Sequence, residues 1–468
     1  MSDPIRILLF GAGNRGAATY GQFGLEHPDQ IQFVAVAEPN PQRRERFARE
    51  HRIPPERQFN DWSEALAAGK IADAVINATQ DEMHHESTIA ALHAGYDMLL
   101  EKPISTTLNE TVEIIQTAET LGRTLMICHV LRYTDFFGQV KNIFASGRLG
   151  QIAHVSHSEN VSYYHMAHSY VRGNWRNLAI SSPMILAKCC HDLDLLYWFL
   201  GEKCTLLSSM GNLRHFKPEN APPGAPPRCT DGCPAAEECP YFAPRIYVES
   251  FPIKSTVSHA QNPLIRAVGQ LTLRHPKLAR SLGKVIPPVR ILTEYSGWPR
   301  NTITENPESD HAVLEALRYG PYGRCVYHSD NDVVDHQTVN MTFESGVTIT
   351  LTMHGHSHDE GRTLRVDGSR ATLLGKLTHS QGWLEIHDHL DGSVERQTFP
   401  TEVEQVGGHG GGDAGLMRSF VLAMHGERAP LTSARDSLES HLMAFAAEES
   451  RLSNVTVKME TFRKKTSG

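Results

Sequence analysis

The chain has 468 residues, of which 40% are hydrophobic and 21% are charged, so it can form the sizeable core of a globular protein. A net charge of −8, with no basic run longer than Arg43-Arg44 or Lys464-Lys465, argues against a nucleic-acid partner. No segment approaches the ~18 apolar residues of a membrane span, and residues 1–10 lack a signal-peptide pattern. We therefore expect a cytoplasmic protein with no membrane partner, whose eight cysteines are reduced thiols or metal ligands.

The first part of the chain alternates short apolar runs with helical patterns. Strands are predicted at 5–10, 33–37, 74–78, 97–100 and 124–128, and helices at 17–25, 41–51, 62–68, 87–95 and 108–121. This alternation indicates βαβ units around a buried parallel sheet. We therefore predict an α/β Rossmann domain at residues 1–130.

The second part reads differently, because its apolar residues alternate with period two between hairpin turn signals such as Asp367-Gly368 and Asp391-Gly392. Strands are predicted at 151–160, 333–343, 347–356, 362–366, 383–390 and 393–399, and helices at 191–200, 414–424 and 434–450. The pattern favours an α+β domain at 131–468 with an open, mostly antiparallel sheet. A Pro-rich and then basic, loosely patterned stretch at about 212–330 is interpreted as an insertion in this domain.

A glycine motif follows the first predicted strand and opens the first helix. Gly11 permits a tight turn, Gly13 lets the backbone approach a pyrophosphate at the helix N-terminus, and Gly16 allows close packing of helix on sheet. The residues between them, Asn14 and Arg15, then lie beside the phosphates. The position of the motif inside a βαβ unit predicts a dinucleotide site.

Glu38 ends the second predicted strand, about 20 residues after the glycines, where a carboxylate can accept hydrogen bonds from the ribose hydroxyls. A carboxylate there also repels a 2′-phosphate, which favours NAD over NADP. Arg43 and Arg44 lie close enough in sequence to weaken this preference. A solvated loop position is the alternative for Glu38.

Lys102 follows the strand predicted at 97–100, at the edge where a side chain can enter the cofactor crevice. Its ammonium could bind a substrate hydroxyl and stabilise a developing alkoxide. Taken alone, such a lysine would more often be a surface residue.

Together these residues resemble the glucose–fructose oxidoreductase / inositol dehydrogenase / rhizopine catabolism (Gfo/Idh/MocA) family. The segment from Thr79 to His84 resembles the family's Thr-Pro-Asn-x-x-His loop, with Gln80 and Asp81 as departures. Other matches are the Glu-Lys-Pro tripeptide, an Arg-Tyr pair after the last Rossmann strand and a His-x-x-Asp helix start, at Glu101–Pro103, Arg132–Tyr133 and His191–Asp194.

The resemblance implies an NAD-dependent enzyme that transfers a hydride between a sugar or polyol carbon and nicotinamide. Lys102 would polarise the reacting hydroxyl, and His191 would be the general acid/base. It also implies cofactor contacts from Thr79, His84 and Glu101, and substrate contacts from Arg132 and Asp194. A non-enzymatic NAD-binding regulator is a further alternative, because the family also contains such proteins.

The position four residues before His191 departs from the family, whose dehydrogenases often carry an Asp there. This chain has Ala187 followed by Lys188, which is therefore a candidate for an acid/base or substrate-binding role. The departure leaves open an NAD-dependent glycoside hydrolase that works by transient oxidation and elimination. Further candidates for substrate contacts in either reaction are Tyr163, Tyr164, His165 and His409.

Four cysteines of the insertion, three of them in a C-x3-C-x5-C pattern, could bind structural zinc or an iron–sulfur cluster. They are Cys229, Cys233, Cys239 and Cys325, and free thiols or disulfides are the alternatives. Because open sheet faces and edges are usually covered, we also expect a homo-oligomer, either a dimer or a tetramer.

Overall fold

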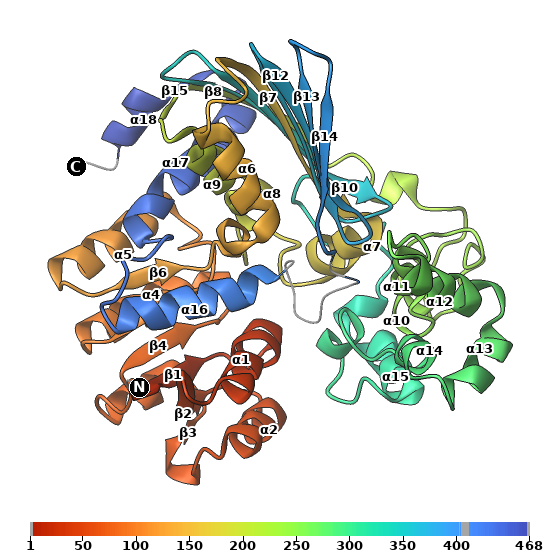
Figure 1. The fold of residues 1–468 in the computed structure, drawn as a ribbon. Coiled ribbons are helices and arrows are strands. Elements are labelled where there is room, and N and C mark those ends of the chain that lie inside the picture. The colour runs from red at the N-terminus through yellow and green to blue at the C-terminus, as the bar shows by residue number, and fades with distance from the viewer. Residues whose placement is uncertain (1–2, 402, 404–410, 466–468) are drawn as a thin grey trace.

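The computed structural model describes residues 3–401, 403 and 411–465. The structure has two main sheets, and helices pack against each of them. A separate lobe of helices lies to one side (Figure 1). The first sheet belongs to the N-terminal part of the chain and the second to the remainder, as the sequence predicts.

The first sheet has six parallel strands in the order β3-β2-β1-β4-β5-β6. Their bounds are β1 Ile5–Phe10, β2 Ile31–Ala37, β3 Gln58–Phe59, β4 Ala74–Asn77, β5 Asp97–Leu100 and β6 Leu125–Ile127. From Ile7 to Phe10 every β1 side chain is fully buried, because helices cover both faces of the sheet. The order reverses between β1 and β4, which is where ligands bind in folds of this type.

The connecting helices are α1 Gln22–Glu26, α2 Pro41–His51, α3 Trp62–Ala67, α4 His84–His93 and α5 Leu108–Thr120. Local signals explain their starts: the Asn40 side chain accepts hydrogen bonds from the backbone N–H groups of Gln42 and Arg43, and Pro41 occupies the first turn. The helix predicted at 17–25 begins earlier, as a π-helical segment at Asn14–Gly21 that continues into α1.

The second sheet has nine strands in the order β14-β13-β12-β11-β7-β10-β9-β8-β15. Their bounds are β7 Ile152–Ser162, β8 Cys204–Asn212, β9 His336–Phe343, β10 Thr348–Ser357, β11 Gly361–Gly368, β12 Ala371–Thr378, β13 Gly382–Asp388, β14 Val394–Thr398 and β15 Val457–Lys458. The β7–β10 pair is parallel and the other pairs are antiparallel. The predicted open, mostly antiparallel sheet is thus confirmed.

One face of this sheet packs on helices α6 Asp135–Ala145, α8 Met184–Ala187, α9 Cys190–Leu200 and α17 Ala434–Ser453, and α18 Met459–Lys464 follows β15 (Figure 1). Along β10 the side chains alternate, with Ile349, Leu351 and Met353 buried and Thr350 and Thr352 half-buried on the other face. Helix α16 Gly412–Met424 lies against the N-terminal domain, so the end of the chain reaches back to the glycine turn.

The insertion is more helical than its sequence suggests. It forms α10 Ala243–Tyr247, α11 Phe251–Val257, α12 Pro263–Arg274, α13 Pro276–Gly283, α14 Pro287–Thr293 and α15 Asp310–Tyr319. The prolines that broke the predicted pattern begin helices here, since Pro263, Pro276 and Pro287 each occupy a first helical position. Before the insertion, β7 leads into the short helix α7 Tyr163–His165 and a π-helical turn at Met166–Arg172.

Candidate active site

The glycine turn after β1 leaves an open space beside its backbone. Gly11 has φ +83°, and a Cβ there would lie 2.6 Å from the carbonyl oxygen of Ala78. A Cβ on Gly16 would lie 1.9 Å from the carbonyl oxygen of Gly11, whereas one on Gly13 would meet no atom within 4 Å. Gly13 is also the N-cap of the Asn14–Gly21 helix, with no side-chain cap. This combination of a tight turn, an uncapped helix start and free space fits a pyrophosphate.

Glu38 lies against the same turn. Its side chain is buried and accepts hydrogen bonds from the backbone N–H groups of Ala12 (2.8 Å) and Asn40 (2.9 Å). The two nearby arginines are engaged elsewhere: Arg44 donates to the Glu38 carbonyl (2.6 Å), and Arg43 pairs with Glu305 of the insertion (2.6 Å). Glu38 is therefore fixed by backbone groups beside Gly13, as a ribose-binding carboxylate requires.

Arg15 joins three distant segments over the glycine helix. Its guanidinium pairs with Glu101 (2.5 Å) and with Asp413 at the start of α16 (2.7 Å), and it donates to the Tyr20 hydroxyl (2.8 Å). Burial opposes ionisation of Glu101, but Arg15 and Tyr20 hold the pKa of this carboxyl below its ordinary value. In the described structure, Arg15 and Glu101 thus bind each other, while the Asn14 side chain is exposed.

The loop at Thr79–His84 packs around the Lys102 segment. The Thr79 hydroxyl donates to the Asn77 side chain (2.8 Å), and the buried His84 ring bonds the carbonyl of Pro103 (2.7 Å). Asp81 accepts a hydrogen bond from the Trp175 indole (2.9 Å). Burial raises the pKa of the Asp81 carboxyl, and the nearby His84 and Lys102 act in the opposite direction.

Lys102 follows β5 and reaches across to the second domain. Its ammonium donates a hydrogen bond to the backbone carbonyl of Ala187, the last residue of α8, at 2.8 Å. The His191 side chain belongs to the first turn of the next helix, α9, and is 5% exposed. Lys102 is therefore tied to the helical segment that carries His191, although the two residues are far apart in sequence.

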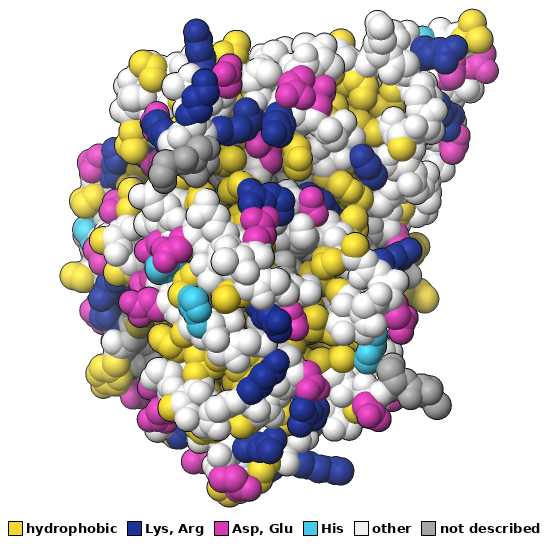
Figure 2. All heavy atoms as spheres, turned by 90° about the vertical axis from the view of Figure 1, so that its left-hand side faces the viewer, with side chains coloured by type: hydrophobic (Ala, Val, Ile, Leu, Met, Phe, Trp, Pro, Cys, Tyr) yellow, Lys and Arg dark blue, Asp and Glu magenta, His cyan; other side chains and the backbone are white. Residues whose placement is uncertain are grey.

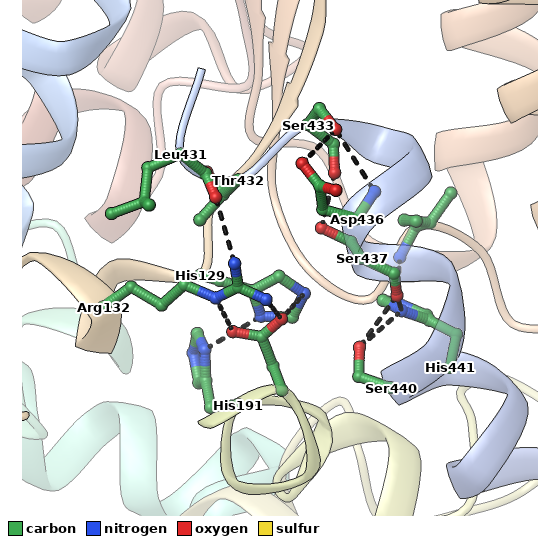
Figure 3. A network of polar contacts seen from close by, with 12 residues as sticks. His129, Arg132, His191, Leu431, Thr432, Ser433, Asp436, Ser437, Ser440 and His441 are labelled. Carbon is green, nitrogen blue, oxygen red and sulfur yellow. Dashed lines mark hydrogen bonds and ion pairs between the residues drawn. The ribbon is translucent and has the colours of Figure 1, made fainter. Parts of the chain in front are cut away.

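His191 lies in a buried polar network that Figure 3 shows. Its Nδ1 lies 3.4 Å from Nδ1 of His129, whose ring also lies near the Arg132–Asp194 pair. Arg132 donates two hydrogen bonds to Asp194 (2.6 and 2.7 Å) and one to the Leu431 carbonyl (3.0 Å). Burial, Arg132 and Lys102 hold the pKa of His129 well below its ordinary value, so His129 stays neutral beside His191.

Lys188 sits in a second buried network, on the inner face of the large sheet. Its ammonium pairs with Glu360 (2.8 Å) and Glu159 (3.5 Å), and Glu360 also bonds the His165 ring (2.6 Å). Burial opposes the charge on Lys188, but the two carboxylates raise its pKa above the ordinary value. Lys188 thus remains a cation that faces carboxylates rather than His191, which the sequence did not indicate.

Further charges on the inner sheet face complete this network. Arg362 pairs with Glu159 (2.5 Å) and with Asp192 (3.1 Å), and Asp192 also accepts from His157 (2.7 Å). Burial raises the pKa of Glu159 to about 7, which makes it the group here that can change protonation near neutrality. Sequence reasoning missed these residues, although the alternation of β7 placed His157 and Glu159 on its buried side.

Comparison with known proteins agrees with this geometry. Residues 5–129 match the family model described as an oxidoreductase family with an NAD-binding Rossmann fold. The N-terminal domain is thus similar to the Gfo/Idh/MocA oxidoreductases. The resemblance stated from the sequence is thus confirmed for this Gfo/Idh/MocA domain, and with it the NAD-binding Rossmann fold.

Relatives extend the similarity beyond the Gfo/Idh/MocA domain. The protein YteT of Bacillus subtilis is 20% identical over 381 residues, 79% of this chain and 76% of YteT. Inositol 2-dehydrogenase 2 of Saccharopolyspora erythraea is 29% identical over 133 residues, 28% of this chain and 36% of that enzyme. The crystal structure of an oxidoreductase from Agrobacterium radiobacter with NAD+, L-tartaric acid and magnesium covers 98% of this chain and 99% of its own, with 14% identity and a TM-score of 0.64. This last similarity shows that the fold extends over both domains.

The residues that follow β7 lie in two different environments. Tyr163 is half-buried, and His165 bonds Glu360 in the Lys188 network. Tyr164 is 2% exposed and packs with the insertion, its ring 5.8 Å from that of Trp298. The His165 side chain is thus more exposed than that of Tyr164. His409 lies outside the described residues.

The four cysteines of the insertion line one small cavity together with Arg172. However, among the described residues no group of three His, Cys, Asp or Glu side chains is placed so that it could hold a metal ion. The zinc or iron–sulfur site predicted from the sequence is therefore not supported by these side-chain positions. The spacing predicted the convergence of the four residues but could not fix the directions of their side chains.

A larger cavity of about 430 Å³ lies at an edge of the second sheet. All of its lining residues follow the Gfo/Idh/MocA domain in the chain. Its lining residues are Arg214, His215, Asn220, Asp335, His336 and His356. In the described part of the chain, no helix is long and apolar enough to cross a membrane.

Proposed function

We propose that the protein is an NAD-dependent oxidoreductase that transfers a hydride between a sugar or polyol carbon and nicotinamide. The observation that carries the proposal is the tie between Lys102 and the segment of His191, next to a glycine turn that fits a dinucleotide. The inositol 2-dehydrogenase relative supports a polyol as the substrate class. The fixed Glu38 carboxylate supports NAD over NADP, because a 2′-phosphate beside it would be repelled.

In this proposal NAD, when bound, supplies the acceptor for the hydride that leaves the substrate carbon. The Lys102 ammonium uses one N–H on the Ala187 carbonyl and keeps others for the substrate hydroxyl. Its positive charge stabilises the oxygen as that hydroxyl loses its proton. The His191 imidazole receives the proton, and the neutral His129 beside it adds no competing charge.

Other predicted residues support this arrangement in the proposal without contacting the substrate. Arg132 and Asp194 bind each other and hold the helix of His191 against the Rossmann domain. Arg15 and Glu101 order the glycine helix under the cofactor, and His84 fixes the backbone after Lys102. These residues therefore act as positioning residues.

The experiment that tests the proposal is a panel of polyols, sugars and glycosides incubated with the enzyme and NAD+, with NADH absorbance and released aglycone recorded together. The proposal expects net NADH from at least one polyol or sugar, and loss of the signal in Lys102→Met. Tight NAD binding with no turnover across the panel would instead support a non-enzymatic NAD-binding regulator.

A second candidate, the NAD-dependent glycoside hydrolase, is favoured by the Lys188 network. His165 and Glu159, which lie beside the Lys188 cation, provide acid/base groups separate from His191, and such a reaction needs a second base for the C–H proton next to the transiently oxidised carbon. The base takes that proton, the bond to the aglycone breaks, water replaces the aglycone and the hydride returns. Aglycone release that requires NAD but gives no net NADH would select this reaction.

We also propose that the four cysteines hold a structural metal. Support comes from their common cavity and from Arg172, which is fully buried there with no hydrogen-bond partner at Nη1. Four thiolates around zinc carry a net negative charge that would balance this cation. Metal analysis of purified protein tests the proposal: one equivalent of metal, lost in Cys233→Ser, supports it, and metal-free protein with reactive thiols contradicts it.

A homo-oligomer, dimer or tetramer, is proposed from the outer face of the second sheet. In the described residues this face carries half-buried and exposed small polar side chains, including Thr338, Asn340, Thr350 and Thr352, and no helix of the same chain covers them in Figure 1. Uncovered sheet faces of this kind are ready interfaces. Light scattering during size-exclusion chromatography measures the mass and would contradict the proposal if it gave a monomer.

A further inference from the structure

The helices α11 to α14, residues 251–293, form a unit that we call the basic cap. It contains no Asp or Glu, although the chain as a whole has a net charge of −8. Its seven basic residues are Lys254, Arg266, Arg274, Lys277, Arg280, Lys284 and Arg290. The charge of the basic cap is therefore opposite to that of the rest of the molecule.

No ion pair of the described residues includes these positive charges, although Glu249 and Asp310 lie near Lys254. Among the described residues, none of the seven takes part in a salt bridge. Lys277, Arg280 and Lys284 are exposed, on α13 and just after it. Burial and the nearby Arg280 lower the pKa of Lys254, so the cations lie close enough to repel one another. Such a surface is stabilised by an anionic partner.

The basic cap also exposes several large apolar side chains. Its helices touch through small residues: a Cβ on Gly269 would lie 2.3 Å from the Ser258 backbone nitrogen, and Ala279 is fully buried. Val289 and Leu292 are buried within the cap, but Leu264, Val285 and Ile291 are 79%, 76% and 68% exposed. Exposed aliphatic side chains of this size, set among basic ones, mark an interaction surface.

The opposite side of the molecule differs from the basic cap in its charges. Figure 1 shows α11 to α14 at the side of the molecule away from the N-terminal domain, and Figure 2 shows the side opposite to them, where basic and acidic side chains are interspersed. The side opposite to the cap thus mixes both signs of charge, whereas the cap has basic residues and no acidic ones.

We propose that the basic cap docks the protein on a membrane surface that contains anionic lipids. Lys and Arg side chains bind the headgroups, and Leu264, Val285 and Ile291 enter the boundary between headgroups and acyl chains. The expectation of no membrane partner rested on the lack of a spanning segment, and surface docking needs none. The proposal is independent of the oxidoreductase function, because no residue of the cap belongs to the candidate active site.

A second copy of this chain fits the cap less well than an anionic membrane does. A two-fold interface between two caps would place seven cations against seven cations with no acidic residue between them. Protein interfaces are also depleted in Lys, whereas the cap has three lysines.

The test is co-sedimentation of the full-length protein with vesicles of phosphatidylcholine alone or mixed with phosphatidylserine. We expect binding to the phosphatidylserine vesicles only, weakened by added salt. The variant Lys277→Glu/Arg280→Glu/Lys284→Glu should bind about tenfold more weakly or worse. The variant Leu264→Ser/Val285→Ser/Ile291→Ser should also bind more weakly, because exposed aliphatic area is lost.

Matched controls place the same chemistry elsewhere on the surface. Leu390→Ser removes a side chain that is 96% exposed outside the cap, between β13 and β14, and Arg365→Glu reverses an exposed charge on β11. Both should bind vesicles like the unchanged protein, and NAD binding should be retained in every variant. The proposal is overturned if the unchanged protein stays in the supernatant with phosphatidylserine vesicles, if the cap variants bind as well as the controls, or if the cap variants convert an oligomer into monomers without affecting vesicle binding.

Discussion

The ammonium of Lys102 and the backbone carbonyl of Ala187 are joined by a 2.8 Å hydrogen bond that spans the two domains. Lys102 follows the last-but-one strand of the parallel sheet, and Ala187 ends the short helix before His191. This bond holds the lysine side chain in a fixed direction at the sheet edge where cofactors bind. It thus links the glycine turn, the lysine and the imidazole into one candidate catalytic centre.

The first prediction concerns Lys102. Lys102→Met should lower turnover by about a hundredfold or more, because the developing alkoxide loses its cation. NAD affinity, measured by quenching of protein fluorescence, should change little, since Lys102 faces the substrate in this account. Lys70→Met, which removes an exposed lysine on the far side of the sheet, is the control. Full activity of Lys102→Met with saturating substrate would contradict the assigned role.

Two glycines that look equivalent in the sequence should behave differently. Gly13→Ala places a methyl group where no atom lies within 4 Å, so the protein should fold normally and lose NAD affinity. Gly16→Ala places one 1.9 Å from the Gly11 carbonyl oxygen, so it should lower the melting temperature as well. Thermal unfolding and NAD titration of both variants separate the two effects. Equal NAD affinity in Gly13→Ala and the unchanged protein would remove the pyrophosphate from this position.

Glu38 should set the choice between NAD and NADP. Glu38→Ala should weaken NAD binding by about tenfold, the value of a lost hydrogen bond to a charged group. NADP binding should change less, because the repulsion of the 2′-phosphate also disappears. The measurement is the ratio of the two dissociation constants, with the exposed Glu56→Ala as a control. An unchanged ratio would show that Glu38 is not the ribose-binding carboxylate.

Acid should destabilise the protein through His441. This histidine accepts a hydrogen bond from the backbone of Ile104 and is fully buried, and burial together with His129 lowers its pKa to about 3. The unfolded chain binds a proton at this histidine near pH 6.5 and the folded chain does not. The contribution of His441 to the free energy of unfolding is therefore complete above that pH. It falls by about 1.4 kcal/mol per pH unit between about 6.5 and 3.

Urea unfolding at a series of pH values measures this slope. His441→Gln keeps a polar side chain in the same place and removes the titrating ring. The free energy of unfolding of this variant should therefore depend on pH less steeply, by up to the equivalent of one bound proton. If both proteins lose stability at the same rate as the pH falls, His441 does not carry the effect.

Much of the fold could be predicted from the sequence, because the N-terminal strands and helices follow simple local patterns. The run from Ile5 to Phe10 is bounded by Gly11, and its bounds as strand β1 are as predicted. The insertion was harder, since Pro263 and Pro276 interrupt the apolar pattern and yet begin helices. Proline permits both a break and a first turn, and only the packing of small residues such as Gly269 decides between them.

The residues of the candidate site also differ in whether the sequence could predict their positions. Gly13, Glu38 and Lys102 follow strands of one sheet, so their chain positions alone place them at a common edge. The partners of Lys188 could not be predicted, because Glu159 and Glu360 come from two strands whose pairing depends on the whole second sheet. Cross-strand neighbours of this kind leave no spacing signal along the chain.

The central claim is that Lys102 and His191 act on a substrate beside a bound NAD. It is tested most directly by a single-turnover experiment with excess enzyme, NAD+ and a substrate that the panel identifies, recorded by stopped-flow NADH absorbance. The account predicts a rise in absorbance, lasting or transient, that is absent in Lys102→Met and strongly slowed in His191→Asn, while both variants still bind NAD. Product formation without any NADH signal, or equal rates in the enzyme stripped of NAD, would contradict it.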